Sequence, residues 1–163
     1  LKDHRVTMEP VLKEEVLCVG KTSVISASEA PISFEELTHL PVLLLRQGAS
    51  SRALIDRPGL LSRLEANTPL QLNSISGITN GMLAGLGCTI APKVFVREHL
   101  AKGVLHARPI VRPSLSRQLF LGYRRDTPSN LLFEAMKALV LQLIEGEVRS
   151  NNWEAEYIHW SAV

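Results

Sequence analysis

The chain of 163 residues has little cysteine, few aromatic side chains and no excess of either charge. Its two cysteines, Cys18 and Cys88, lie in apolar strand-like runs, which predicts reduced core thiols in a cytoplasmic protein rather than a disulfide framework. The Lys and Arg residues are scattered and the formal net charge is +2, so no nucleic-acid surface is indicated. No apolar run reaches the length of a membrane span, and no signal peptide is visible.

Motifs for catalysis or metal binding are also missing. The histidines are His4, His39, His99, His106 and His159. None of them has the spacing of a metal ligand set, and a solvent-exposed or cap-adjacent position is the better interpretation of each. The sequence contains no G-x-S-x-G elbow, no P-loop and no dinucleotide fingerprint, because Gly81, Gly85 and Gly87 have the wrong spacing. We therefore expect no metal, no cofactor and no enzymatic activity.

The chain does have a hydrophobic content of 45%, enough to bury a core in one domain or two small lobes. Strand-like and helix-like segments alternate, which is typical of an α/β sheet. We expect strands at Val11–Val19, Pro41–Leu45, Leu70–Leu72 and Val104–Val111. We expect helices at Ser33–Leu37, Ser50–Asp56, Leu60–Glu65, Lys93–Leu100 and Asn130–Ile144. Ser33 and Glu36 have the spacing of a capping box, and Lys21–Pro31 is interpreted as a connection rich in Ser and Ala.

The stretch from Asn73 to Pro92 is the most informative part of the sequence. Ser74 is placed to cap a helix that Gly85 and Gly87 end. The apolar face of this helix is expected to consist of Ile75, Ile78, Met82 and Leu83. A buried strand at Cys88–Ile90 follows and is closed by the proline. Such a unit directs free backbone N–H groups and the positive end of a helix dipole at the space above the strand ends, which favours a small anion.

Residues Ala84–Pro92, with the sequence AGLGCTIAP, are similar almost residue for residue to a helix end, strand and proline in the second lobe of LysR-type transcriptional regulators. Four more segments resemble parts of the same effector-binding domain at the expected places along the chain. They are Glu15–Gly20, Leu40–Asp56, Arg117–Arg125 and Asn130–Ile144. The resemblance covers about residues 10 to 145, and Asn151–Val163 has only a vaguer likeness to the nitrogen-assimilation-control branch.

The resemblance implies an α/β, periplasmic-binding-protein-like (type 2) effector domain, with a complete second lobe and the closing part of the first lobe. It implies residues 1–19 as the end of the first lobe and crossover strand, 20–112 as the second lobe, and 113–163 as the return strand, docking helix and tail. A hinge between the lobes is expected at Val19, Gly20, Lys21 and Pro113. The winged helix-turn-helix and linker helix that precede this domain in the family are not recognisable ahead of Val11.

A ligand is expected in the crevice between the lobes, because open α/β sheets bind ligands outside their strand ends. The second-lobe wall of this site is expected to comprise Arg46, Gln47, Gly48, Ser50, Ser51, Ser74, Ile75 and Ser76. The serines supply hydroxyls, Gln47 an amide, Gly48 a close backbone approach and Arg46 a fork for a carboxylate. The alternative, which the sequence leaves open, is that Ser50 and Ser74 only cap helices.

The resemblance implies a ligand-sensing domain of a DNA-binding transcriptional regulator. A small anionic metabolite would bind between the lobes, change their angle and alter a homo-oligomer, either dimer or tetramer, on DNA. The segment Ser51–Glu65 is the expected oligomer contact, and DNA and RNA polymerase are partners only through the full-length protein. The alternatives are a solute-binding receptor of the same fold and an enzyme such as a prephenate dehydratase-like catalyst. The tail Asn152–Trp160 alternates like an edge strand, which either covers the first lobe or pairs with a neighbouring subunit.

Overall fold

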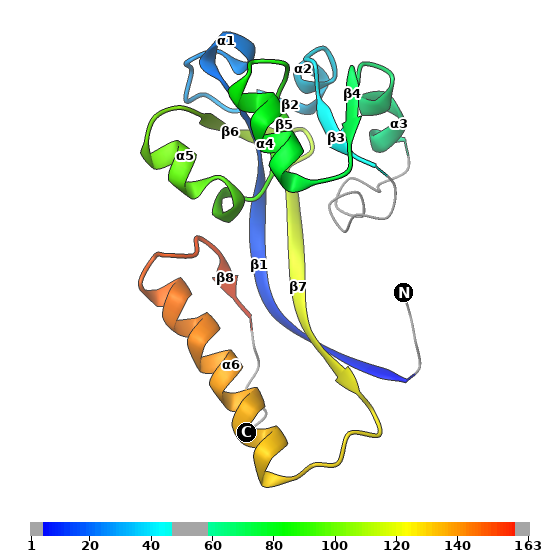
Figure 1. Cartoon of the computed structure of the whole chain (residues 1–163), viewed down its shortest axis with the longest axis vertical. Helices are drawn as coiled ribbons and strands as arrows, with labels where there is room; N and C mark the ends of the chain where they lie inside the picture. The colour runs from blue at the N-terminus through cyan, green and yellow to red at the C-terminus, as the bar shows by residue number, and fades with distance from the viewer. Residues whose placement is uncertain (1–4, 47–58, 159–163) are drawn as a thin grey trace. The chain divides into compact units, whose positions relative to one another are not determined.

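The computed structural model describes residues 5–46 and 59–158. They form two compact units, one comprising Glu15–Ser116 and the other combining the chain up to Glu14 with the chain from Arg117 onward. Two strands that pair with each other, β1 (Val6–Gly20) and β7 (Leu115–Arg124), contribute residues to both units (Figure 1). The mixture of helices and sheet confirms the α/β class predicted from the sequence.

The main sheet of the Glu15–Ser116 unit is built around the carboxyl end of β1 and includes β2 (Ile32–Ser33), β5 (Thr89–Ala91) and β6 (His106–Val111). A separate two-stranded sheet consists of β3 (Leu43–Leu45) and β4 (Leu70–Leu72). β1 pairs antiparallel with both β5 and β6, and β2 joins β6 in parallel. β3 and β4 form a parallel pair, which a parallel bridge between Val42 and Cys88 attaches to the β5 side of the sheet.

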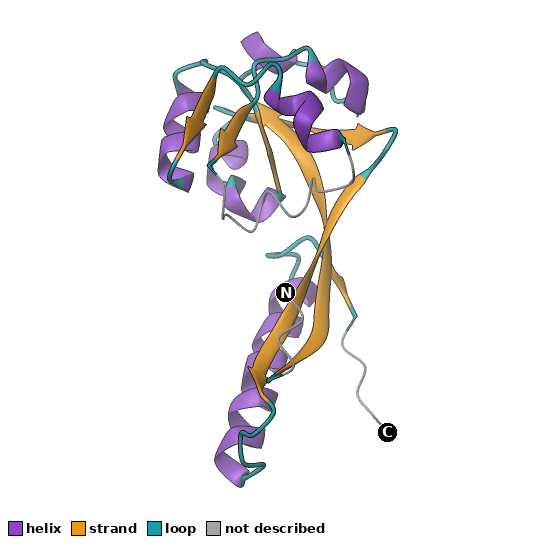
Figure 2. Cartoon of the chain, turned by 90° about the vertical axis from the view of Figure 1, so that its right-hand side faces the viewer, coloured by secondary structure: helices purple, strands orange, loops and turns teal. Residues whose placement is uncertain are grey.

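Short helices accompany these strands (Figure 2). They are α1 (Thr22–Ile25), α2 (Phe34–Thr38), α3 (Leu60–Glu65), α4 (Ile75–Leu83), the 3-10 helix η2 (Lys93–Phe95) and α5 (Arg97–Ala101). The capping box predicted for α2 is confirmed, because the Glu36 N–H donates to the Ser33 hydroxyl at 3.2 Å and the Ser33 N–H donates to the Glu36 carboxylate at 2.8 Å. The Ser33 hydroxyl and backbone N–H also hold the pKa of the Glu36 carboxyl below its usual value.

The core of this unit consists of two clusters of buried side chains. Successive residues of β1 enter different clusters, with Val16 and Cys18 in one and Val19 in the other. β3 behaves in the same way, because Leu44 belongs to the first cluster and Leu43 to the second. Neighbouring residues of a strand point to opposite faces, so both faces of the sheet are covered. Pro41–Leu45 was predicted to contain a strand buried on both faces, and β3 confirms this prediction.

Helix α4 and the turn after it follow the sequence prediction in most respects. Ser74 caps the helix, Ile78 and Met82 are buried, and Gly85 has φ +75°, a left-handed conformation that favours glycine. Gly87 is a close-approach position, since a Cβ there would lie 2.2 Å from the Pro41 carbonyl oxygen. Ile75, which was also predicted on the apolar face, is 52% exposed and is not part of the core.

The other unit contains one long helix, α6 (Leu131–Arg149), and the short strand β8 (Glu156–Tyr157). Asn130 caps α6 by accepting the Phe133 N–H at 2.9 Å, and Leu141 packs with Val11 and Leu12 of β1. β8 pairs antiparallel with β1, with Tyr157 opposite Leu12. Of the two roles that the sequence left open for the tail, the structure shows the first, because β8 extends the sheet of its own unit.

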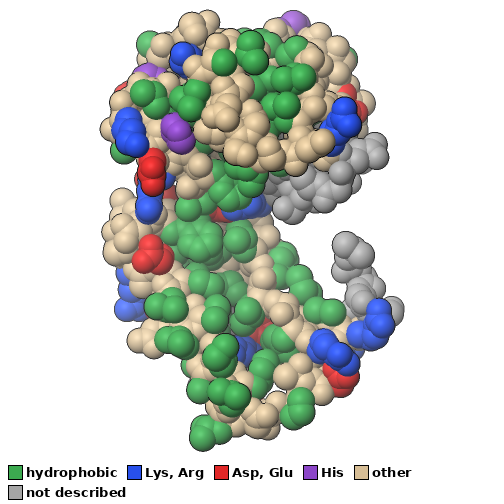
Figure 3. Space-filling view, in the orientation of Figure 1, with side chains coloured by type: hydrophobic (Ala, Val, Ile, Leu, Met, Phe, Trp, Pro, Cys, Tyr) green, Lys and Arg blue, Asp and Glu red, His purple; other side chains and the backbone are tan. Residues whose placement is uncertain are grey.

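The outer face of α6 is hydrophobic and exposed (Figure 3). Its large exposed side chains are Leu131, Leu132, Met136, Leu139, Val140 and Leu143. Only three hydrophobic side chains form the buried part of this unit's cluster among the described residues, which is little for an independent core.

Two further predictions needed correction at element boundaries. Lys21–Pro31 is not only a connection, because it contains α1. The helix expected at Lys93–Leu100 is divided, since η2 and α5 meet at Val96, whose φ and ψ of −124° and 9° are not helical. The helix expected at Ser50–Asp56 lies outside the described residues. Within residues 5–46 and 59–158, none of the helices combines the length and apolarity needed to cross a membrane.

Candidate functional site

The β3/β4 pair brings two of the predicted site residues to one edge of the sheet. The strands are parallel and Leu45 lies opposite Leu72, so their carboxyl ends meet at the same edge. Arg46 follows β3 directly, and its backbone N–H donates to the Leu72 carbonyl at 2.9 Å. Ser74 comes two residues after β4, and both Arg46 and Ser74 are exposed. The edge therefore brings the backbone of Arg46 and the Ser74 hydroxyl together from separate parts of the sequence.

Helix α4 begins at this edge and leaves hydrogen-bond donors available. The Ser74 hydroxyl accepts the Gly77 N–H at 3.1 Å and the Ser76 hydroxyl at 3.3 Å. Both acceptor positions of the Ser74 oxygen are therefore used, and its own O–H remains as a donor. The N–H groups of the first turn, including those of Ile75 and Ser76, have no carbonyl one turn earlier in the helix to bind. This end of the helix carries no acidic side chain in its first turn and favours an anion.

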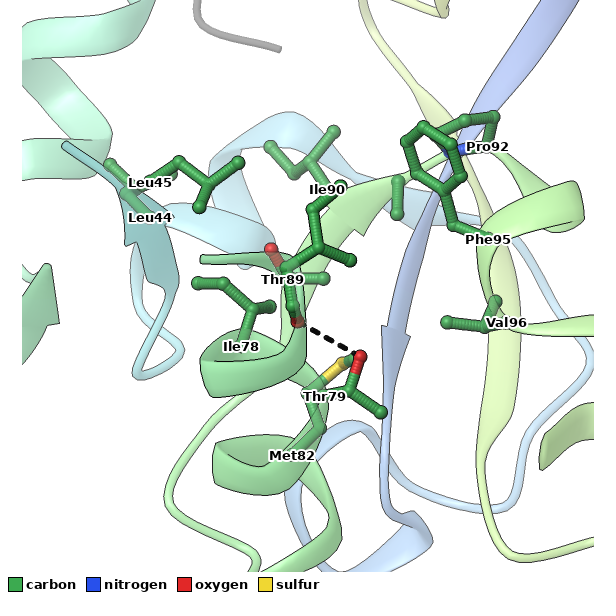
Figure 4. Close-up of a pocket in the computed structure, with 12 residues that line it drawn as sticks. Leu44, Leu45, Ile78, Thr79, Met82, Thr89, Ile90, Pro92, Phe95 and Val96 are labelled. Carbon is green, nitrogen blue, oxygen red and sulfur yellow. Dashed lines mark hydrogen bonds between the residues drawn. The ribbon is translucent and has the colours of Figure 1, made fainter. Parts of the chain in front are cut away.

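An apolar pocket lies beside the amino end of α4 (Figure 4). It has a volume of about 50 Å³. Its lining comes from β3, α4, β5 and the turn at η2, and consists of Leu44, Leu45, Ile75, Ile78, Thr79, Met82, Thr89, Ile90, Ala91, Pro92, Phe95 and Val96. Ile75 and Phe95 are 52% and 43% exposed, so two apolar side chains of the lining remain open to solvent.

The two threonines do not make this pocket polar. The Thr79 hydroxyl donates to the Ile75 carbonyl at 3.0 Å, the bond drawn in Figure 4. The Thr89 hydroxyl donates to the Leu43 carbonyl at 2.8 Å. Both hydroxyl hydrogens are therefore used within the protein, and the pocket offers a ligand mainly hydrocarbon surface.

The remaining predicted site residues fall into two groups. Gln47, Gly48, Ser50 and Ser51 lie outside the described residues, so their part in the site stays a prediction. Ile75 and Ser76 are exposed at the first turn of α4, as the prediction requires. The sequence did not indicate Ile90, Pro92 and Phe95 as site residues. The available signal was an apolar strand that ends in proline next to another apolar turn, which alone does not distinguish a pocket from core.

The predicted hinge residues lie in and next to the sheet of the Glu15–Ser116 unit. Val19 is opposite both Thr89 and Ala107, and Gly20 is opposite His106. Lys21 precedes α1 as its cap residue. Pro113 lies between β6 and β7. The chain passes between the two compact units at Glu14–Glu15 and at Ser116–Arg117, and the assignment of the hinge to the four named residues stays a prediction.

The two cysteines are part of the core. Cys18 and Cys88 are free and buried, which confirms the prediction of unpaired core thiols. A hydrogen bond with Cys18 and burial both raise the pKa of the Cys88 thiol, so it stays protonated and is a poor nucleophile. Among the described residues, no group of three or more His, Cys, Asp or Glu side chains is arranged to hold a metal ion.

Residues 1–145 of the sequence match the LysR substrate binding domain family. The chain belongs to this family. The resemblance found in the sequence is thereby confirmed, and with it the assignment to the effector-binding part of LysR-type regulators.

Similar proteins include two transcriptional regulators. A probable RuBisCO transcriptional regulator from Trichormus variabilis is 30% identical over 115 residues, which are 68% of this chain and 34% of that protein. The nitrogen assimilation regulatory protein nac from Klebsiella aerogenes is 24% identical over 139 residues, or 85% of this chain and 45% of that protein. The chain thus spans a third to a half of the length of these regulators.

Solved structures show the same fold at low sequence identity. The reduced form of OxyR from N. meningitidis has a TM-score of 0.72 and 22% identity, covering 97% of this chain and 72% of that one. The effector-binding domain of QuiR in complex with shikimate has a TM-score of 0.72 and 16% identity, covering 87% and 66%. These likenesses confirm the predicted fold of a LysR regulatory domain.

Proposed function

We propose that this chain senses a small anionic metabolite on behalf of a LysR-type transcriptional regulator. The observation that carries the proposal is the convergence of Arg46, the Ser74 hydroxyl and the first turn of α4 at one sheet edge. A carboxylate at this edge accepts hydrogen bonds from the Ser74 O–H and from backbone N–H groups, while the Arg46 guanidinium supplies charge. No covalent step is involved, so the function is binding and not catalysis.

The metabolite is proposed to bind between the two lobes and to change their angle, with the DNA contacts made elsewhere in the full-length regulator. A ligand shifts such an equilibrium only by its difference in affinity for the two lobe arrangements. The regulator is proposed to act as a homo-oligomer, and its location is proposed to be the cytoplasm. The membership of the family and the buried reduced cysteines support these proposals.

The exposed face of α6 is proposed to pack against the rest of the first lobe in the full-length protein. The OxyR structure is matched over 72% of its length, so more than a quarter of that protein has no counterpart in this chain. The α6 face, with Leu132, Met136 and Leu143 between 56% and 72% exposed, is a surface that such a segment would bury. A covered α6 face also supplies the core that the described part of this unit lacks.

Calorimetric titration of the full-length protein with small carboxylates tests the anion site. The Ser74→Ala variant is expected to bind them about tenfold more weakly, because it loses a hydrogen bond to a charged group. Asn130→Ala is the matched control, since it also removes an exposed helix cap, at α6 and away from the site. Equal loss of affinity in both variants, or no loss in Ser74→Ala, would exclude Ser74 from the site.

A further inference from the structure

The apolar pocket is continuous in sequence and structure with the proposed anion site. Ile75 lines the pocket and belongs to the first turn of α4, directly after Ser74. Leu45 also lines the pocket and directly precedes Arg46. Residues of the anion site and residues of the pocket are therefore direct neighbours in the sequence, both at the end of β3 and at the start of α4. A ligand whose charged end binds at the edge of the sheet next to Ser74, here called the Ser74 edge, has the pocket beside it.

The chemistry of the lining restricts what enters the pocket. Thr79 and Thr89 are its only two hydroxyl-bearing residues, and both donate to backbone carbonyls. A hydroxyl or carboxylate of the ligand would lose its water in the pocket without gaining a donor from these side chains, which is unfavourable. A hydrocarbon group loses nothing there and contacts leucine, isoleucine and phenylalanine side chains. The pocket therefore selects an apolar part of the ligand.

The pocket is small and partly open. Its volume is about 50 Å³, and the lining side chains Ile75 and Phe95 are 52% and 43% exposed. A compact alkyl group is therefore the simplest probe of the pocket.

We infer that the effector is a small monocarboxylate that carries an apolar group, and that this group occupies the pocket lined by Ile75, Ile90 and Phe95. This inference rests on the proposed function, because the carboxylate is held at the Ser74 edge. The pocket gives the site its specificity, since the anion-binding groups alone do not distinguish one carboxylate from another.

The test is a calorimetric titration of the full-length protein with acetate, glutarate and 4-methylpentanoate, with weak ligands measured by displacement. Each buried methylene contributes about fourfold in affinity. 4-Methylpentanoate has four more carbons than acetate, so we expect it to bind roughly 250-fold more tightly if all four are buried. Glutarate places a second carboxylate at the pocket and is expected to bind no more tightly than acetate.

One variant removes apolar lining away from the anion site. Phe95→Ser changes a side chain that is 43% exposed. It is expected to weaken 4-methylpentanoate binding about tenfold and to leave acetate binding unchanged, because only the pocket is altered. Leu86→Ser is the matched control, since Leu86 is 56% exposed and is absent from the lining. This control is expected to bind all three ligands as the parent does.

The outcomes separate this inference from the function on which it rests. Equal affinity for acetate, glutarate and 4-methylpentanoate would overturn the pocket inference and leave the anion site in place. The same conclusion follows if Leu86→Ser weakens 4-methylpentanoate binding as much as Phe95→Ser does. Binding of none of the three carboxylates by the parent protein would overturn both proposals.

Discussion

The Glu14→Gln substitution is expected to lower the free energy of unfolding by about 3 kcal/mol. The Glu14 side chain is only 2% exposed, and it forms an ion pair with Arg117, which is 14% exposed. Its second carboxylate oxygen accepts the Trp153 indole N–H at 2.9 Å. The neutral amide removes the charge of the Glu14 carboxylate, while the Arg117 guanidinium stays charged at a poorly solvated position. The resulting loss in the free energy of unfolding is larger than that for breaking a surface ion pair. Urea unfolding followed by tryptophan fluorescence measures the effect.

Glu15→Gln is the matched control, because it makes the same chemical change one residue later at an exposed position. It is expected to alter the free energy of unfolding by less than about 0.5 kcal/mol. Similar values for the two variants would show that burial of Glu14 does not determine its contribution to stability.

The ion pair also lies at the boundary of its unit. β1 leaves the unit after Glu14, and β7 enters it at Arg117. The pair therefore joins the two strands at that point.

The Gly87→Ala substitution is expected to be nearly as damaging, with a loss of about 2–3 kcal/mol in the free energy of unfolding. A Cβ at this position would lie 2.2 Å from the Pro41 carbonyl oxygen and 3.0 Å from the Leu43 side chain. That carbonyl accepts the Cys88 N–H at 2.9 Å, in the connection that attaches β3 to β5. Relief of the clash requires movement of backbone on both sides of this bridge. Thermal and urea unfolding monitored by circular dichroism measure the loss.

Gly122→Ala separates a backbone clash from a side-chain clash. A Cβ at Gly122 would lie 2.9 Å from the Met8 sulfur, and Met8 is 54% exposed. A flexible exposed thioether can rotate away, so the expected loss is under about 1 kcal/mol. Equal losses for Gly87→Ala and Gly122→Ala would contradict the account of the Pro41 contact.

The parts of the fold that the sequence predicted are those with local signals. The Ser74 cap, the left-handed Gly85 and the capping box of Ser33 and Glu36 are each specified within a few residues. The apolar run at β3 was also readable, because a strand covered on both faces has few polar residues. These signals predicted the sheet edge from which the candidate site is built.

The remainder depended on contacts between distant residues. Glu14 lies in a charged patch of sequence, and only the pairing of β1 with β7 and the position of Trp153 explain its burial. The apolar pocket combines β3, α4, β5 and η2, and no single segment of the sequence encodes its shape. Ile75 belongs to the predicted apolar face of α4, but its side chain is 52% exposed and lines the pocket rather than the core.

The central claim is that a small carboxylate binds at the amino end of α4, and the most direct test is an NMR titration of the full-length protein with 4-methylpentanoate. The backbone amide resonances of Ile75, Ser76 and Gly77 should shift with saturation, since their N–H groups lie at the proposed site. The amides of Leu131 and Leu132 at the start of α6 provide the comparison, and they should not shift. Saturable shifts at α4 alone would support the account. Shifts of equal size at both helix ends, or saturable binding without any change at α4, would contradict it.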